Sequence, residues 1–213
     1  MSAEMPSETA AQTPVQTPAA EPERRASIGP QRSPDARAAI LAAAEEVLVE
    51  RGPRGLSIEA VARRAKAGKP TIYRWWPSRA ALLLEVYHAR KTQVRLEGTG
   101  DVAADLEVFL ATLFAHWRSP GAGAVFRSVI AEAQCDAEAA AALAAYAGER
   151  RAHMTELLAR AQAQGALRAE AEPELLAEMV QSFAWGRLLT DRLDLSPAEI
   201  AAAVRQLLAG AGA

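Results

Sequence analysis

The sequence is poor in cysteine, aromatic residues and long apolar runs. Cys135 is the only cysteine among 213 residues, which excludes an internal disulfide and a thiolate metal cluster. Aromatic residues make up 5% of the chain, β-branched residues are sparse and Ala is abundant, which favours helices over sheets. No apolar run approaches the roughly 20 residues that span a membrane, and the N-terminus has no secretory signal. We expect an all-α, soluble, cytoplasmic protein with no membrane partner.

Motifs for catalysis and metal binding are also missing. The chain has no nucleophile motif, no phosphate-cradling glycine loop and no His-Glu-x-x-His pair. His88, His116 and His153 are too scattered in the sequence to indicate a metal site. We therefore predict that the protein is not an enzyme and that it needs no cofactor.

Charge is distributed unevenly along the chain. Residues 32–95 contain 13 basic and six acidic residues, a net charge of +7. Residues 96–213 contain nine basic and 16 acidic residues, a net charge of −7. Only the first of these segments is suited to contact a polyanion such as DNA.

The N-terminal residues 1–33 differ in composition from the rest. They hold five prolines and almost no bulky apolar side chain, so they cannot bury enough surface to offset the entropy of ordering. We predict a disordered tail. Arg24, Arg25 and Arg32 leave open a contact of this tail with DNA.

Helix caps and breakers divide residues 34–209 into about nine helices. Ser33, Ser57 and Ser78 stand where N-caps are expected, and Gly52-Pro53 ends the first apolar repeat. No alternation typical of strands occurs. The expected helices span about 34–50, 57–65, 69–75, 78–90, 101–118, 122–134, 136–164, 173–190 and 196–209.

Residues 56–84 predict a helix-turn-helix, the motif whose second helix enters the major groove of DNA. Lys66-Ala67-Gly68 forms the tight turn. Lys69 begins the second helix, where its charge adds to the positive end of the helix dipole. Thr71 offers a hydroxyl and a methyl group to base edges. A three-helix bundle with a merely basic surface is the alternative, and the clustering of these groups with Tyr73 and Arg74 argues against it.

At these positions the chain resembles the TetR/AcrR family of transcriptional repressors. The resemblance lies in three motifs: Ser57-Ile58-Glu59-Ala60-Val61-Ala62, Lys69-Pro70-Thr71-Ile72-Tyr73-Arg74-Trp75-Trp76 and Pro77-Ser78-Arg79-Ala80-Ala81-Leu82. It implies a helix-turn-helix DNA-binding domain at 34–95 and a helical ligand-sensing and dimerisation domain at 96–213.

The resemblance also implies roles for single residues. Thr71 and Arg74 would lie near base edges, and Arg79, where the family usually has Lys, would hold a phosphate. Trp76 would pack into the core. The implied DNA-binding residues are Ser57, Lys69, Pro70, Thr71, Tyr73, Arg74, Trp75 and Arg79.

The turn departs from the family pattern, which usually reads Ala-Gly-Val-Ser. Lys66 stands where Gly normally takes a left-handed conformation, which costs a non-Gly residue about 1 kcal/mol. Gly68 replaces a hydroxyl that would cap the second helix, a slight loss because Gly is a tolerable N-cap. Either change is able to alter operator preference.

The second half of the chain is less specific. The resemblance implies a ligand pocket among the middle helices and a dimer interface on the last two, although ordinary core packing would give the same apolar pattern. His116 and Arg127 are the candidate polar anchors of the pocket. The candidate pocket residues are Phe109, Leu113, Phe114, Trp117, Phe126, Ile130 and Trp185. The candidate interface residues are Met179, Phe183, Ile200, Val204 and Leu207.

Together these features predict a homodimeric transcriptional repressor that binds a double-stranded DNA operator and leaves it when a small-molecule effector occupies the second domain. A ligand-independent architectural or nucleoid-type DNA-binding protein is the alternative. A helical enzyme or lipid-binding module with an incidental basic face is a third possibility, which DNA affinity at low salt would exclude.

Overall fold

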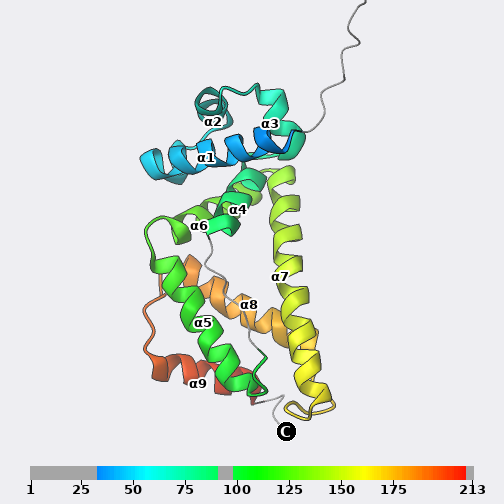
Figure 1. Cartoon of the computed structure of the whole chain (residues 1–213). Coiled ribbons are helices and arrows are strands. Elements are labelled where there is room, and N and C mark those ends of the chain that lie inside the picture. Colours follow the sequence, from blue (N-terminus) through cyan, green and yellow to red (C-terminus); the bar gives the residue numbers. More distant parts are fainter. Residues whose placement is uncertain (1–32, 91–97, 210–213) are drawn as a thin grey trace, which may run out of the picture. The chain divides into compact units, whose positions relative to one another are not determined.

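The computed structural model describes residues 33–90 and 98–209, which form nine α-helices and no strand (Figure 1). This confirms the predicted all-α architecture. The helices are α1 (Pro34–Gly55), α2 (Ile58–Ala65), α3 (Lys69–Trp75), α4 (Arg79–Arg90), α5 (Val102–Arg118), α6 (Ala122–Ala133), α7 (Ala137–Ala163), α8 (Pro173–Leu189) and α9 (Pro197–Leu208). The predicted tail, apart from Ser33, lies outside the described residues, and so does the segment 91–97, which holds the predicted domain boundary.

Most helices begin after a residue whose side chain caps the first turn, as the sequence predicts. Ser33, Ser57, Asp101 and Asp136 each accept a hydrogen bond from a backbone N–H in the first turn of the helix that follows. Ser196 forms a reciprocal capping box with Glu199 at the start of α9. These caps satisfy donors that have no partner within the helix, which explains why the helix starts were predictable.

The first helix differs from the prediction at its C-terminal end. The sequence predicts a stop at Gly52-Pro53, whereas α1 continues to Gly55 across a kink. Gly52 has φ 67° and ψ 179°, a conformation that glycine adopts without steric penalty. Pro53 then begins a last helical turn, in which its missing N–H is not needed. Gly52-Pro53 therefore predicted where the helix is interrupted, but not that it continues beyond the kink.

The first four helices enclose a small core. α1 packs against α2, α3 and α4, and Ile40, Val47 and Ile72 are almost completely buried there. Trp76 is 3% exposed, which confirms the prediction that it packs into the core. Its Nε1 donates a hydrogen bond of 2.5 Å to Glu85 Oε2 on α4, so the end of α3 is held against α4.

α4 connects the helix-turn-helix to the remaining helices. Besides α1, it packs against α6 and α7, and α7 extends from α4 to α8 (Figure 1). α5 packs against α6, α8 and α9. α4 packs against α1 on one side and against α6 and α7 on others. A displacement of α4 would therefore shift residues both in the first four helices and in the C-terminal helices.

The α5–α6 junction depends on a glycine at a close approach of two backbones. A Cβ on Gly123 would lie 2.6 Å from the carbonyl oxygen of Trp117 and 3.4 Å from Leu188 Cδ1. Gly123→Ala is therefore expected to lower the free energy of unfolding by about 1–3 kcal/mol, measured by urea denaturation, because the backbone must shift. Gly148→Ala in α7 is the control, since a Cβ there meets no atom within 4 Å, and it should stabilise by about 0.5–1 kcal/mol. Equal effects of the two substitutions would contradict this interpretation.

Candidate DNA-binding surface and ligand cavity

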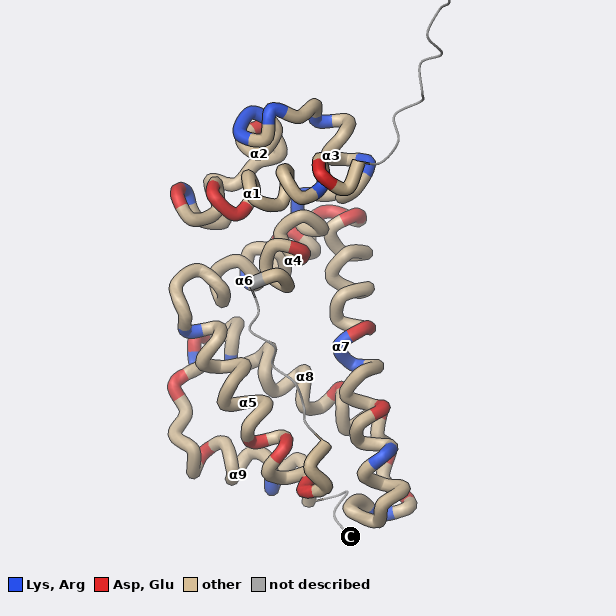
Figure 2. Tube along the Cα trace, in the orientation of Figure 1, with Lys and Arg blue, Asp and Glu red and all other residues tan. Residues whose placement is uncertain are grey.

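The turn between α2 and α3 has the geometry of a helix-turn-helix. Lys66 has φ 51° and ψ 36°, which confirms the left-handed conformation predicted for this position. Gly68 caps α3 without a side-chain hydrogen bond, also as predicted. Lys and Arg residues are concentrated at the end of α2 and in this turn (Figure 2), where the sequence has Arg63, Arg64, Lys66 and Lys69.

The strain at Lys66 is measurable. Lys66→Gly is expected to raise the free energy of unfolding by about 0.5–1 kcal/mol, because relief of about 1–2 kcal/mol of left-handed strain exceeds the entropy that Gly adds to the unfolded chain. Urea denaturation of the DNA-free protein measures the change. Lys66→Ala removes the same charge and keeps the strained conformation, so it should give no gain. A gain from Ala as large as that from Gly would point to charge rather than backbone strain.

The predicted groove helix exposes only some of its side chains. Lys69 and Pro70 are exposed and Tyr73 is 48% exposed, whereas Thr71 and Arg74 are partly buried. Lys69 Nζ lies 3.1 Å from Glu59 Oε1, and both side chains are more than half exposed. Such an exposed ion pair is weak, so a DNA phosphate is able to replace Glu59. Ser57, partly buried, accepts a hydrogen bond of 3.1 Å from Ala60 N.

Trp75 and Trp76 share a cation. The guanidinium of Arg37 on α1 lies 5.7 Å from each ring centroid and also pairs with Glu85. Trp75, which the resemblance places among the DNA-binding residues, is partly buried, and its ring helps to fix α3 on α1. The sequence did not reveal Arg37, which precedes the motifs by about 20 residues.

Arg79 points into the protein rather than standing free at the start of α4. Its Nε donates a hydrogen bond of 2.6 Å to Leu56 O, and its two terminal nitrogens donate to Pro53 O and to the carboxylate of Glu132 on α6. Its side chain is 22% exposed. A DNA phosphate would have to displace these groups, so the structure supports a tie between the α1–α2 junction and α6 rather than the predicted phosphate contact.

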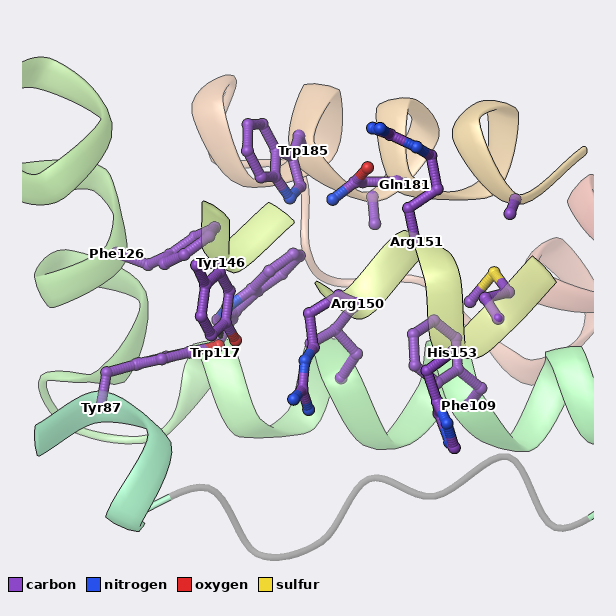
Figure 3. A pocket seen from close by; sticks show the side chains of 14 residues that line it. Tyr87, Phe109, Trp117, Phe126, Tyr146, Arg150, Arg151, His153, Gln181 and Trp185 are labelled. Atoms are coloured by element: carbon purple, nitrogen blue, oxygen red, sulfur yellow. Dashed lines mark hydrogen bonds between the residues drawn. The ribbon is translucent and has the colours of Figure 1, made fainter. Parts of the chain in front are cut away.

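A cavity of about 70 Å³ lies among α4, α5, α6, α7 and α8 (Figure 3). Five of the seven predicted pocket residues line it: Phe109, Leu113, Trp117, Phe126 and Trp185. Phe114 and Ile130 do not; both are buried in the surrounding core, where Phe114 packs against Trp117 and Phe183. The remaining lining residues, which the sequence did not single out, are Tyr87, Tyr146, Arg150, Arg151, His153, Met154, Ala177, Gln181 and Ala184.

Aromatic rings form one wall of this cavity. Phe126 stacks on Tyr87 at 5.1 Å and on Trp117 at 5.9 Å between ring centroids, and the Trp185 ring stands on it edge to face at 5.5 Å. Trp117 Nε1 donates a hydrogen bond of 2.8 Å to Tyr87 Oη. Burial raises the pKa of Tyr146 to about 12 and that of Tyr87 further above its ordinary value, so both hydroxyls stay neutral at physiological pH.

The two predicted polar anchors lie elsewhere. His116 packs edge-on against Tyr87 at 5.3 Å but lines a different hollow of about 490 Å³ beside the α5–α6 turn. Arg127 donates to Leu188 O at 3.2 Å and pairs with Asp191 at 3.4 Å. The larger hollow shares only Tyr87 with the aromatic cavity and is lined by no Asp, Glu, Lys or Arg.

The predicted interface residues divide into two groups. Met179 is 43% exposed, and Phe183 and Leu207 are partly buried. Ile200 and Val204 are 5% and 0% exposed in the single chain, because the apolar face of α9 packs against α5. These two residues belong to the protomer's own core and leave no surface for a partner, which corrects their assignment to the interface.

Two further expectations concern absences. Among residues 33–90 and 98–209, no helix is both long and apolar enough to cross a bilayer. Within the same ranges, no three His, Cys, Asp or Glu side chains gather in a way that would hold a metal ion.

The fold and the basic helix-turn-helix define a DNA-binding transcriptional regulator, and comparisons with known proteins identify the family. The family model described as bacterial regulatory proteins, tetR family, matches residues 40–86. The model described as tetracyclin repressor-like, C-terminal domain, matches residues 96–207. The chain therefore belongs to the TetR family of transcriptional regulators.

Individual relatives agree with this assignment. The TetR family transcription regulator SCO0332 is 33% identical, with a TM-score of 0.71 over 83% of this chain and 98% of that one. The uncharacterized HTH-type transcriptional regulator YdeS of Bacillus subtilis (strain 168) is 29% identical over 71% of this chain and 77% of YdeS. Salmonella enterica GusR, 22% identical with a TM-score of 0.61 over 82% of this chain and 96% of GusR, shares the fold.

Proposed function

We propose that the protein is a homodimeric repressor that leaves its DNA operator when a small molecule enters the aromatic cavity. The observation that carries the proposal is that α4 and α6 both line the cavity and are both linked to the segment just before α2. Tyr87 on α4 and Phe126 on α6 stack in the cavity wall, while Arg79 on α4 and Glu132 on α6 pair beside the helix-turn-helix. Both proposed sites therefore bear on the same pair of helices.

The size of the cavity supports coupling to ligand. A cavity of about 150 Å³ in an apolar core holds benzene, and the cavity here has about half that volume. We therefore expect a ligand with one or more rings to widen the cavity, whose lining includes Phe126 on α6 and Tyr87 on α4. We propose that this widening shifts α4 or α6, so that the ligand binds the shifted and unshifted forms with different affinity, as population shift requires.

For DNA contact we propose the exposed side of α3 and the start of α2. Lys69, Tyr73 and Ser57 would contact phosphates, and Thr71 and Arg74 would meet base edges. Pro70 and Trp75 would lie against the backbone, and we withdraw Arg79 from this set because of its inward contacts. One helix-turn-helix covers few base pairs, so a two-fold dimer that reads two half-sites gives the selectivity a repressor needs. The protein would act in the cytoplasm, where such an operator lies.

For the dimer we propose the outer face of α8. Three of the six exposed large apolar side chains among the described residues lie on this helix, Leu175, Met179 and Leu189. Leu175 and Met179 are four residues apart and Phe183 four further on, so they follow one face. An exposed apolar stripe of this kind is typical of a surface that a partner covers.

Met179→Asp is expected to weaken the dimer at least a hundredfold, about 2.7 kcal/mol, because each protomer would bury an unpaired carboxylate. Sedimentation equilibrium measures the dissociation constant. Val108→Asp is the control, since Val108 is a 63% exposed apolar residue on α5, outside the proposed surface. Equal weakening by both substitutions, or none by Met179→Asp, would remove α8 from the interface.

Fluorescence anisotropy on DNA fragments from beside the protein's own gene tests the repressor proposal. Selective binding at about 0.15 M salt, at least a thousandfold tighter than to scrambled DNA, is expected of a repressor. An architectural binder would discriminate weakly between sequences and would not respond to a ligand in the cavity. Sequence-independent binding would therefore favour that alternative, and no binding at low salt would overturn both.

A further inference from the structure

The charge of the cavity lining is opposite in sign to the net charge of residues 96–213 as a whole. Residues 96–213 carry a net charge of −7, yet the lining includes Arg150 and Arg151 and no Asp or Glu. The other polar lining residues are Tyr87, Tyr146, His153 and Gln181. A cavity with cationic groups and no carboxylate favours an anion and disfavours a cation of the same shape.

Arg150 is the group best placed to receive this anion. It comes from α7, and its guanidinium lies 5.7 Å from the centroid of the Tyr146 ring. Its Nε is buried and has no hydrogen-bond acceptor in the described part of the chain. The carboxylate of Glu149 lies 3.8 Å from a terminal nitrogen, beyond hydrogen-bonding distance, and is 72% exposed. A buried donor without an acceptor is unusual in a folded protein, and since the Arg150 side chain is 39% exposed, an acceptor that enters the cavity is able to reach it.

The aromatic wall indicates the shape of that partner. Trp117 and Tyr87 each stack on Phe126, with interplanar angles of 18° and 22°, and Trp185 stands edge to face against Phe126. Flat rings pack on such a wall by stacking or edge-to-face contact, whereas a flexible aliphatic chain gains no comparable geometry. The guanidinium of Arg150 matches a planar carboxylate with two parallel hydrogen bonds.

We propose that the effector is a flat aromatic acid, with its ring against Phe126 and Trp185 and its carboxylate on Arg150. This inference rests on the proposed function, because it names the ligand class of the cavity through which release would occur. The ring replaces contacts that the lining side chains make with one another, and the carboxylate supplies the acceptor that Arg150 Nε lacks.

Arg151 provides a matched control one residue away. It also lines the cavity, but in Figure 3 its side chain extends toward Gln181 on α8, whereas Arg150 extends in the opposite direction, toward the floor formed by α5. Arg150→Gln and Arg151→Gln remove the same charge from the same helix. Only the first removes the donor beside the aromatic wall.

Isothermal titration calorimetry on the DNA-free, full-length protein tests the proposal. The probes are 2-naphthoate, its neutral analogue 2-naphthalenemethanol and its cationic analogue 2-naphthylmethylamine. The wild-type protein is expected to bind the carboxylate at least tenfold more tightly than the alcohol, and the amine more weakly still. Arg150→Gln should abolish the preference, while Arg151→Gln should keep it within about threefold. Arg150→Lys, which keeps the charge and loses the planar fork, should give an intermediate preference and guards against misfolding of the Gln variant.

Three results would overturn the proposal: equal binding of acid and alcohol, a preference that survives Arg150→Gln in a folded protein, or no heat with any probe. A different result would contradict the proposed function. Selective operator binding without release by a bound naphthoate would contradict ligand-controlled release while leaving the ligand class intact. Release of the protein from its operator by neutral compounds alone would support the repressor mechanism and contradict the proposal that the effector is an aromatic acid.

Discussion

Replacing Arg79 by methionine is expected to lower the free energy of unfolding by about 2–4 kcal/mol, because the substitution removes three hydrogen bonds and leaves Glu132 without its counterion. The carboxylate of Glu132 is 24% exposed, so solvent only partly compensates the loss. Urea denaturation gives the stability. The same variant should lose operator affinity through misplacement of α2 and α3, since Pro53 O and Leu56 O lie just before α2.

Two variants separate this role from a DNA contact. Arg118→Met breaks a pair with Asp194 whose side chains are 46% and 99% exposed, and it should change stability by less than about 0.5 kcal/mol. Glu132→Gln keeps the cation at position 79 and disturbs only the tie to α6. It should leave the salt dependence of DNA binding unchanged while weakening the response to ligand. If Arg79→Met were no more harmful to stability than Arg118→Met, the inward contacts would be unimportant and Arg79 would return to the DNA-binding set.

Replacing Lys69 by glutamine is expected to weaken operator binding at least tenfold at 0.15 M salt and to weaken binding to unrelated DNA in the same proportion. The exposed ammonium would hold a phosphate, which carries no sequence information. A dimer would lose two such contacts, so the slope of log affinity against log salt concentration should become shallower by about 1.8. Fluorescence anisotropy over a series of salt concentrations measures both quantities.

The matched control for Lys69 is Arg205→Gln, which removes one positive charge from an exposed position on α9. It should leave the slope unchanged. Thr71→Val is the informative contrast: it alters no charge, so it should keep the slope and change only the ranking of operator sequences. If Lys69→Gln impaired specific binding but spared binding to unrelated DNA, Lys69 would read bases rather than phosphates.

Local signals in the sequence predicted most of the fold. Caps such as Ser57 and Asp136 and breakers such as Gly52 act within a few residues, so the helix boundaries and the kink position follow from neighbours in the chain. The left-handed conformation of Lys66 followed instead from the family resemblance, because the family usually has Gly at this position. The resemblance implied a pocket among the middle helices, and five of the seven bulky residues named for it line the aromatic cavity.

The remaining features depend on partners far apart in the sequence. Arg79 contacts residues 23, 26 and 53 positions away, and no local pattern distinguishes such an arginine from one that faces DNA. Arg150 lies in an Ala-rich helix that carries charges on several faces, and only the packing of α7 reveals which of them meets the cavity. Helical periodicity predicted the apolar face of α9 and did not reveal that α5 covers it.

The exposed Cys135 makes the C-terminal end of α6, next to the Arg79–Glu132 pair, accessible to spectroscopy. Cys135 follows α6 three residues after Glu132, and its backbone N–H donates a 3.0 Å hydrogen bond to Glu132 O. Since the sequence contains no other thiol, a nitroxide or fluorophore attaches at this one position without any engineering. In a dimer the two labels would report the separation of the α6 ends, so a pulsed electron resonance or energy-transfer measurement would follow the motion of α6 directly as ligand is added.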